Sequence, residues 1–163
     1  MKNKLSILLI LTMGFAFTSL FGEGEPMTGK GLEEIIREFS DGEAVASNNV
    51  IEFRYSGLIL YCIYDEDHNR MRIISRIKNY FEVTEEEKDR MMVSNFHSAL
   101  DARYGVSNGE LYSAYIHPLN SLKKADVVSG IYQVASLHLS FGVEYSSGLL
   151  SFGGEEESSD GPI

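Results

Sequence analysis

The fold of this chain is decided by residues 50–64, which read VIEFRYSGLILYCIY. In the first half, Ile51, Phe53 and Tyr55 alternate with polar residues, which is the period of a strand with one buried face. Ser56 and Gly57 then suit a two-residue turn, and residues 58–64 are almost wholly apolar and rich in aromatic and branched side chains. This stretch therefore predicts a β-hairpin.

A two-residue turn also fixes the register of the hairpin. Residues directly opposite each other share one side of a sheet. On one side these pairs are Tyr55 with Leu58, Phe53 with Leu60, and Ile51 with Cys62. This side is apolar enough to be the one that the helices cover.

The other side of the sheet is the candidate binding surface, because three helices cannot easily cover both faces. It combines an apolar strip with charged neighbours, a composition typical of interaction surfaces. The expected partner-binding residues are Ile59, Tyr61, Ile63, Ile74, Arg54, Arg72 and Arg76. Two alternatives stay open: the strip is the ordinary apolar fraction of a sheet surface, or the C-terminal tail covers it.

The segments next to the hairpin along the chain extend it into a sheet and add a helix before and a helix after it. Residues 65–69 form a polar turn, and residues 71–77 alternate again, which completes an antiparallel meander. Upstream, an apolar stripe at i, i+3, i+4 and i+7 predicts a short helix that Asp41 and Gly42 end. Its members are Leu32, Ile35, Ile36 and Phe39.

Downstream, Thr84 and Glu87 have the spacing of a capping box that opens a second helix. We expect this helix to run to Gly105 and to bury Met92, Val93, Phe96, Leu100 and Tyr104. Asn108 and Gly109 are a strong turn signal for a second hairpin that continues to residue 117. A last helix carries the stripe Val127, Val128, Ile131, Val134, Ala135, His138, Phe141 and Tyr145.

The elements therefore follow the order α-β-β-β-α-β-β-α and predict an α+β fold, with the helices packed on one face of an antiparallel sheet. We expect a signal peptide at residues 1–22, a linker at 23–31, a single domain at 32–146 and a disordered acidic tail at 147–163.

The N-terminal segment has the three parts of a secretory signal. Lys2 and Lys4 precede an apolar run, and small or turn-forming residues lie at 19–22 before the charge returns. This pattern predicts a periplasmic or secreted protein without stable membrane insertion after cleavage. The alternative is an uncleaved helix that anchors the chain, because the apolar run is close to the shortest that spans a bilayer.

The net charge argues against nucleic-acid binding, and the cysteine count excludes an internal disulfide. The formal net charge of −10 becomes −12 when residues 1–22 are removed, because two lysines and no acids are lost. Nucleic-acid binding is disfavoured, since phosphate contacts need clustered Lys and Arg. The single cysteine, Cys62, cannot form an internal disulfide.

None of the candidate chemical sites matches a known motif in full. Residues 65–69 start like a calcium loop, but Arg70 and Arg76 occupy the positions that need Gly and Glu. His97 and Asp101 have the i, i+4 spacing of metal ligands on a helix. Cys62 lies inside an apolar run, where a free cysteine packs as a small hydrophobe. We therefore expect no catalytic residues, metal or cofactor.

The pattern resembles the YbjN domain family, whose fold is that of the type III secretion chaperones. The likeness is best over residues 90–145, with Asn95 and Phe96 on a helix, an aromatic residue at 104, the turn at 108–109, the strand 110–116 and a closing helix. The family is described as sensory-transduction regulators and the fold as a protein-binding scaffold. An export signal departs from the type III chaperones, which work in the cytosol.

Two functions follow from these observations. The first is an exported, non-enzymatic protein-binding module that holds a protein partner or a second copy through the open sheet face. The alternative is an envelope hydrolase or a small-ligand-binding protein with an unrecognised site.

Overall fold

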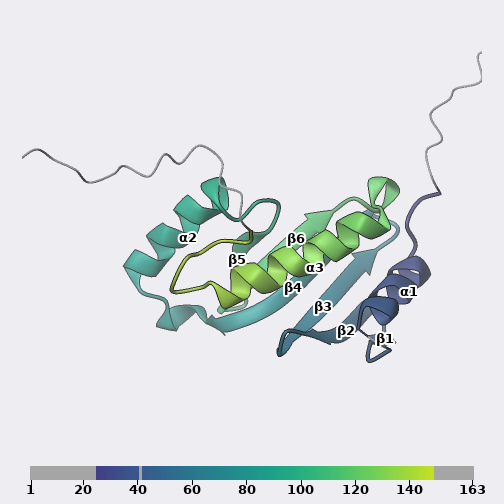
Figure 1. Ribbon diagram of the computed structural model, residues 1–163, viewed down its shortest axis with the longest axis horizontal. Helices are drawn as coiled ribbons and strands as arrows, with labels where there is room; N and C mark the ends of the chain where they lie inside the picture. Colours follow the sequence, from purple (N-terminus) through teal and green to yellow (C-terminus); the bar gives the residue numbers. More distant parts are fainter. Residues whose placement is uncertain (1–24, 41, 149–163) are drawn as a thin grey trace, which may run out of the picture.

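A computed structural model describes residues 25–40 and 42–148. Within these residues a six-stranded antiparallel sheet carries three α-helices (Figure 1). The helices are α1 (Gly29–Phe39), α2 (Glu85–His97) and α3 (Lys124–Leu139). The strands are β1 (Val45–Ser47), β2 (Val50–Tyr55), β3 (Leu58–Asp65), β4 (Arg70–Asn79), β5 (Arg103–Ser107) and β6 (Glu110–His117).

The predicted α+β class and the antiparallel hairpins are confirmed. The sheet is open, with the strand order β1-β2-β3-β4-β6-β5. Sequence reasoning missed the short strand β1, which turns back onto β2 through Asn48 and Asn49, two residues with positive φ of 51° and 62°. It missed β1 because three residues are too few to show a period of two.

The predicted register of the first hairpin is also confirmed. Ile51 lies opposite Cys62 and Phe53 opposite Leu60. Ser56 and Gly57 have φ of 50° and 79°, and Asn108 and Gly109 have 51° and 77°. Positive φ at both central residues is the mark of the type I′ turn, whose twist matches that of the strands it joins.

All three helices pack on the same side of the sheet. Helix α3 lies against β4, β5 and β6, α1 contacts β2 and α3, and α2 contacts β5 at the far end of the sheet from α1 (Figure 1). The core between the layers contains the predicted inward residues, fully buried: Ile51, Phe53, Leu60, Cys62, Leu32, Ile36, Val127, Ile131 and Val134. The helices therefore leave the opposite side of the sheet uncovered among the described residues.

The prediction for the second helix was wrong. Helix α2 ends at His97, and Tyr104 lies in strand β5. Met92, Val93 and Phe96, expected in the core, are 69%, 60% and 78% exposed. The buried side of α2 instead carries Met91 and Ser94, and the Ser94 hydroxyl donates to the Tyr145 carbonyl. The predicted capping box of Thr84 and Glu87 is present.

The ends of the domain differ slightly from the expected boundaries. Helix α1 begins at Gly29, so the last three residues of the expected linker are helical. Ser147, expected to begin the tail, is buried, and its amide donates to the Ser98 carbonyl at 3.0 Å. The predicted signal peptide at 1–22 and residues 149–163 of the tail lie outside the described residues.

None of the helices that the structure describes is long and apolar enough to cross a membrane.

Candidate functional site

The candidate site is the side of the sheet that faces away from the helices. We call it the open face, and it presents one residue in two from each of the four longer central strands. Its members are Val50, Glu52 and Arg54 on β2; Ile59, Tyr61 and Ile63 on β3; Arg72, Ile74 and Arg76 on β4; and Tyr112, Ala114 and Ile116 on β6. All of them are partly or fully exposed.

The structure brings the seven predicted residues together on this face. Ile59, Tyr61 and Ile63 follow one another along β3, and Ile74 on β4 lies opposite Tyr61. Arg54 pairs with Ile59 across the β2–β3 ladder, and Arg72 pairs with Ile63 across the β3–β4 ladder. The apolar strip is therefore continuous and has an arginine beside each end. Whether it binds a partner stays a prediction.

Strand β6 adds residues that sequence reasoning missed. Ile116, Ala114 and Tyr112 lie opposite Arg72, Ile74 and Arg76, and Ile116 is 58% exposed. The alternation in residues 110–116 showed that these three share a face. No sequence signal showed that β6 would lie beside β4, because the helix α2 and the strand β5 separate the two strands in sequence.

The arginines of this face differ in their partners. Arg76 forms an ion pair with Glu110 at 2.7 Å. Within the described residues, the guanidinium groups of Arg54 and Arg72 form neither a hydrogen bond nor an ion pair. Partial burial and the neighbouring Glu52 carboxylate together raise the pKa of Tyr61 above its ordinary value, so its hydroxyl stays protonated and able to donate at neutral pH.

Side-chain amides close the outer edge of β5 at its first residues. The Asn95 side chain accepts a hydrogen bond from the Tyr104 amide at 2.7 Å and donates one to the Tyr104 carbonyl at 3.2 Å. The Gln133 side chain accepts from the amides of Asp101 and Ala102, which directly precede β5. At these residues the side chains replace the bonds that another strand would make. The opposite edge, β1, has three residues.

A second apolar surface lies around α2, and sequence reasoning missed it. Its exposed residues are Phe81, Met92, Val93, Phe96 and Val106. Met92 and Val106 line one shallow hollow between α2 and β5. We call this group the α2 surface. Three of its residues, Met92, Val93 and Phe96, were assigned to the core from the sequence because their spacing is that of a buried stripe.

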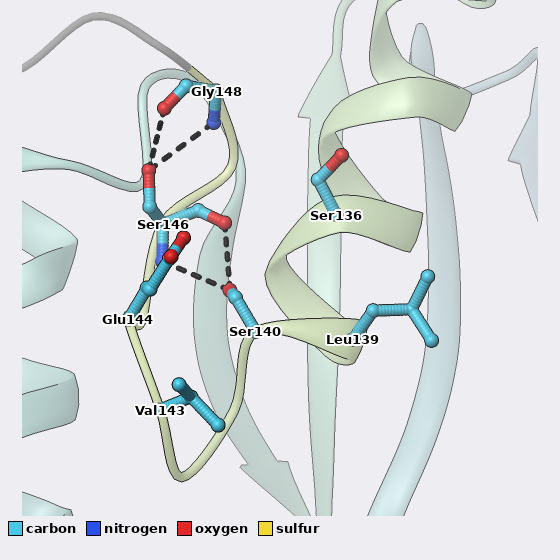
Figure 2. A pocket seen from close by; sticks show the side chains of 7 residues that line it. All are labelled: Ser136, Leu139, Ser140, Val143, Glu144, Ser146 and Gly148. Atoms are coloured by element: carbon cyan, nitrogen blue, oxygen red, sulfur yellow. Dashed lines mark hydrogen bonds between the residues drawn. The ribbon is translucent and has the colours of Figure 1, made fainter.

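A hollow lies at the C-terminal end of α3 (Figure 2). It measures about 560 Å³ and its walls include Ser136, Ser140, Ser146 and Glu144. Figure 2 shows that the Ser140 and Ser146 side chains already form hydrogen bonds within the loop that follows α3. Ser140 Oγ donates to the Ser146 carbonyl at 2.7 Å and accepts from its amide at 2.9 Å. These bonds cap the helix end, and no histidine or metal ligand set adjoins them among the lining residues.

A serine and a histidine do meet elsewhere, but in an arrangement that favours structure over catalysis. Ser75 Oγ lies 2.8 Å from His138 Nδ1 and 3.2 Å from the Ile59 carbonyl. The Ser75 hydroxyl donates to Nδ1 in one tautomer of His138 and accepts from it in the other. Ser75 is also only 1% exposed, which leaves no route for a substrate.

The other candidate groups have structural roles. Burial raises the pKa of Cys62 to about 12, so its thiol is not a nucleophile at neutral pH. His97 and Asp101 do not share a helix, because α2 ends at His97, and the Asp101 carboxylate accepts from Gln133. Asp65 accepts from the His68 amide at 2.9 Å and so closes the predicted turn. No group of three or more potential metal ligands occurs among the described residues.

Comparison with known proteins finds solved structures of similar fold but assigns the chain to no family. No family model and no curated protein matches this chain. A chain of the HopA1-SchA chaperone-effector complex is 10% identical, with a TM-score of 0.54, over 68% of this chain and 88% of that one. The Yersinia pestis type III secretion chaperone SycH, solved with a stable fragment of YscM2, is 11% identical, with a TM-score of 0.54, over 70% and 99%.

A third similar structure comes from the ExoT-SpcS complex of Pseudomonas aeruginosa. It is 12% identical, with a TM-score of 0.51, over 68% of this chain and 93% of that one. The expected fold of the type III secretion chaperones is therefore confirmed. Identities this low are evidence for the fold alone.

Proposed function

We propose that this chain is a non-enzymatic protein-binding module that holds a partner protein on the open face of its sheet. One observation carries the proposal. An apolar strip of Ile59, Tyr61, Ile63 and Ile74 extends into β6 through Ile116, has arginines along it, and is covered by no described helix. Apolar strips with charged residues beside them that remain accessible to solvent are typical of interaction sites.

The chemistry of the described residues supports binding over catalysis. The serine, histidine and cysteine groups described above all have structural partners or are buried. Proteins that share the fold were solved as chaperone complexes with other proteins. A chaperone-like role for this chain rests on that likeness of fold together with the open face, and its partner is a protein or a second copy of the chain.

Two finer features belong to the same proposal. The sequence pattern at residues 1–22 supports export to the periplasm or beyond, with an uncleaved anchor as the alternative. The element order supports a place beside the YbjN domains and their described role in sensory transduction. Intact-mass measurement of the protein from the cell envelope tests export, because a chain that begins near Glu23 would show cleavage and a retained Met1 would show an anchor.

The binding proposal is tested by Tyr61→Asp, which places a charge in the centre of the strip without entering the core. Tagged wild-type and variant proteins are incubated with an extract of the source organism, and the retained proteins are quantified by mass spectrometry. We expect Tyr61→Asp to keep the wild-type denaturation midpoint and to lose the retained partners. Sedimentation of the purified protein shows whether the lost partner is a second copy.

Two controls make the result specific. Val143→Asp changes an exposed apolar residue just after α3 and should retain the partners. Phe96→Asp tests the α2 surface in the same way. If Phe96→Asp loses the partners while Tyr61→Asp keeps them, the binding site is the α2 surface and the proposal is wrong.

A further inference from the structure

The open face has a charge opposite to that of the rest of the protein. Of the 14 lysines and arginines in the chain, five lie on this side of the strands: Arg54, Arg70, Arg72, Arg76 and Arg103. Of the 24 acids, only three lie there among the described residues: Glu52, Asp65 and Glu110. A strongly acidic chain thus presents a locally basic surface around its apolar strip.

Two of these arginines are available to a ligand. The guanidinium of Arg70 donates to the Asn69 carbonyl, that of Arg103 to the Leu100 and Ala102 carbonyls, and that of Arg76 pairs with Glu110. Arg54 and Arg72 have no such partner in the part of the chain that the structure describes. A guanidinium offers five donors in a planar fork that suits a carboxylate.

The position of Arg72 provides a place for such a carboxylate. Arg72, Ile63 and Arg70 line a hollow of about 380 Å³ at one end of the apolar strip. The acid in its wall, Asp65, is already engaged, because its two oxygens accept from the amide and the Nδ1 of His68. The hollow therefore combines an apolar wall with an unpaired guanidinium.

We infer that the open face binds an extended protein segment in which acidic residues flank apolar ones, an inference that rests on the proposed function. Ile59 and Ile63 are four residues apart on β3, with Arg54 beside the first and Arg72 beside the second. Strand spacing and rise place these arginines about 16 Å apart, which an extended segment spans in about five residues. Carboxylates at that spacing reach both guanidinium groups while the side chains between them pack on the strip.

The segment lies across the face and does not extend the sheet. At the β5 edge, the Asn95 side chain forms hydrogen bonds with the Tyr104 amide and carbonyl, so these groups cannot pair with an added strand. At the other edge, β1 is only three residues long and offers few pairing groups. Recognition must then come from side chains, which gives the arginines a large share in choosing the partner. At physiological salt the acidic remainder of the surface is screened over about 8 Å, so it does not cancel the local attraction.

Fluorescence anisotropy with two labelled peptides tests this inference. One carries Glu, then Leu or Phe, then Glu again at every other position, separated by Ser, so that these side chains lie on one side of an extended segment. The other has Lys in place of Glu. We expect the acidic peptide to bind about tenfold more tightly than the basic one. The Arg54→Gln/Arg72→Gln double variant should remove that preference. The Lys30→Gln/Lys124→Gln variant takes the same charge from α1 and α3 and should bind as the wild type does.

The outcomes separate this inference from the proposed function. If Tyr61→Asp abolishes binding of both peptides but the wild type does not distinguish them, the open face is a binding site and the acidic preference is wrong. If the acidic peptide binds and Tyr61→Asp leaves its affinity unchanged, both proposals are wrong. If the wild type binds neither peptide, or if the arginine and lysine variants weaken binding equally, the inference is overturned.

Discussion

Helices α3 and α2 share an apolar periodicity in sequence and have opposite environments in the structure. Both carry apolar residues at helical spacing and both lie on the same side of the sheet. Val127, Ile131 and Val134 of α3 are fully buried, whereas Met92 and Phe96 of α2 are largely exposed. Spacing therefore shows which residues of a helix share a face, but not whether anything covers that face.

The difference comes from what lies beneath each helix. Helix α3 lies across β4, β5 and β6, so its apolar stripe meets a wide apolar layer. Helix α2 contacts the edge strand β5 and the segment after α3, and it does so largely through hydrogen bonds. The Ser98 hydroxyl donates to the Tyr145 carbonyl at 2.8 Å, and the Asn95 amide holds Tyr104. Of its apolar residues only Met91 is buried, and Met92, Val93 and Phe96 stay exposed.

The largest expected effect is the contrast between truncations on the two helices. Ile131→Ala removes a fully buried side chain beneath α3 and should lower the free energy of unfolding by about 2–5 kcal/mol. Phe96→Ala removes an exposed ring and should change it by less than about 0.5 kcal/mol. Urea denaturation measures both values. A large loss for Phe96→Ala would mean that α2 is buried in solution.

A smaller effect should come from the close approach of α3 to the sheet. A Cβ atom on Gly130 would lie 2.6 Å from the Tyr115 ring, which is itself buried. Gly130→Ala should therefore destabilise the protein by about 1–3 kcal/mol, although alanine favours a helix. Ser136→Ala on the exposed side of α3 is the control and should be neutral or slightly stabilising. A gain in stability for Gly130→Ala would show that α3 lies farther from β6.

The contacts of α2 predict a local effect. Asn95→Ala leaves the Tyr104 amide and carbonyl without their side-chain partner and should cost about 1 kcal/mol, since water reaches this edge. Hydrogen exchange should speed up at the Tyr104 amide while the amides of α3 keep their protection. Unchanged exchange at Tyr104 would contradict the proposed closure of the β5 edge.

The smallest effect concerns pH and the end of α3. Burial lowers the pKa of His138 below 6.5, so the unfolded chain binds the proton more readily than the folded one. Stability should therefore fall as pH drops through about 6.5 towards the folded pKa. His138→Gln should remove this part of the pH dependence, measured as the denaturation midpoint between about pH 7.5 and 5.5. An unchanged slope would show that other groups cause it.

The candidate site was predictable to the extent that one hairpin defines it. The alternation of β2 and β3 and the turn at Ser56 placed Ile59, Tyr61 and Ile63 on the open face, and the register confirms their arrangement. Tyr112 and Ile116 were not predictable as members, because 30 residues separate β4 from β6 and the two strands meet only through the sheet. The side-chain amides that close β5 also come from α2 and α3, distant in sequence.

Features that depend on neighbours along the chain could be read from the amino-acid sequence: the type I′ turns, the hairpin register, the capping box at Thr84, the stripe of α1 and the stripe of α3 from Val127 to Ala135. Each follows from local dihedral preferences or from a short period. The predicted members Phe141 and Tyr145 lie beyond the end of α3 at Leu139. Tertiary contacts were needed to learn that Met92, Val93 and Phe96 of α2 stay exposed and that Arg54 and Arg72 lack partners among the described residues beside a continuous strip. Burial and ion pairing depend on which surfaces meet, and that depends on contacts between residues far apart in the chain.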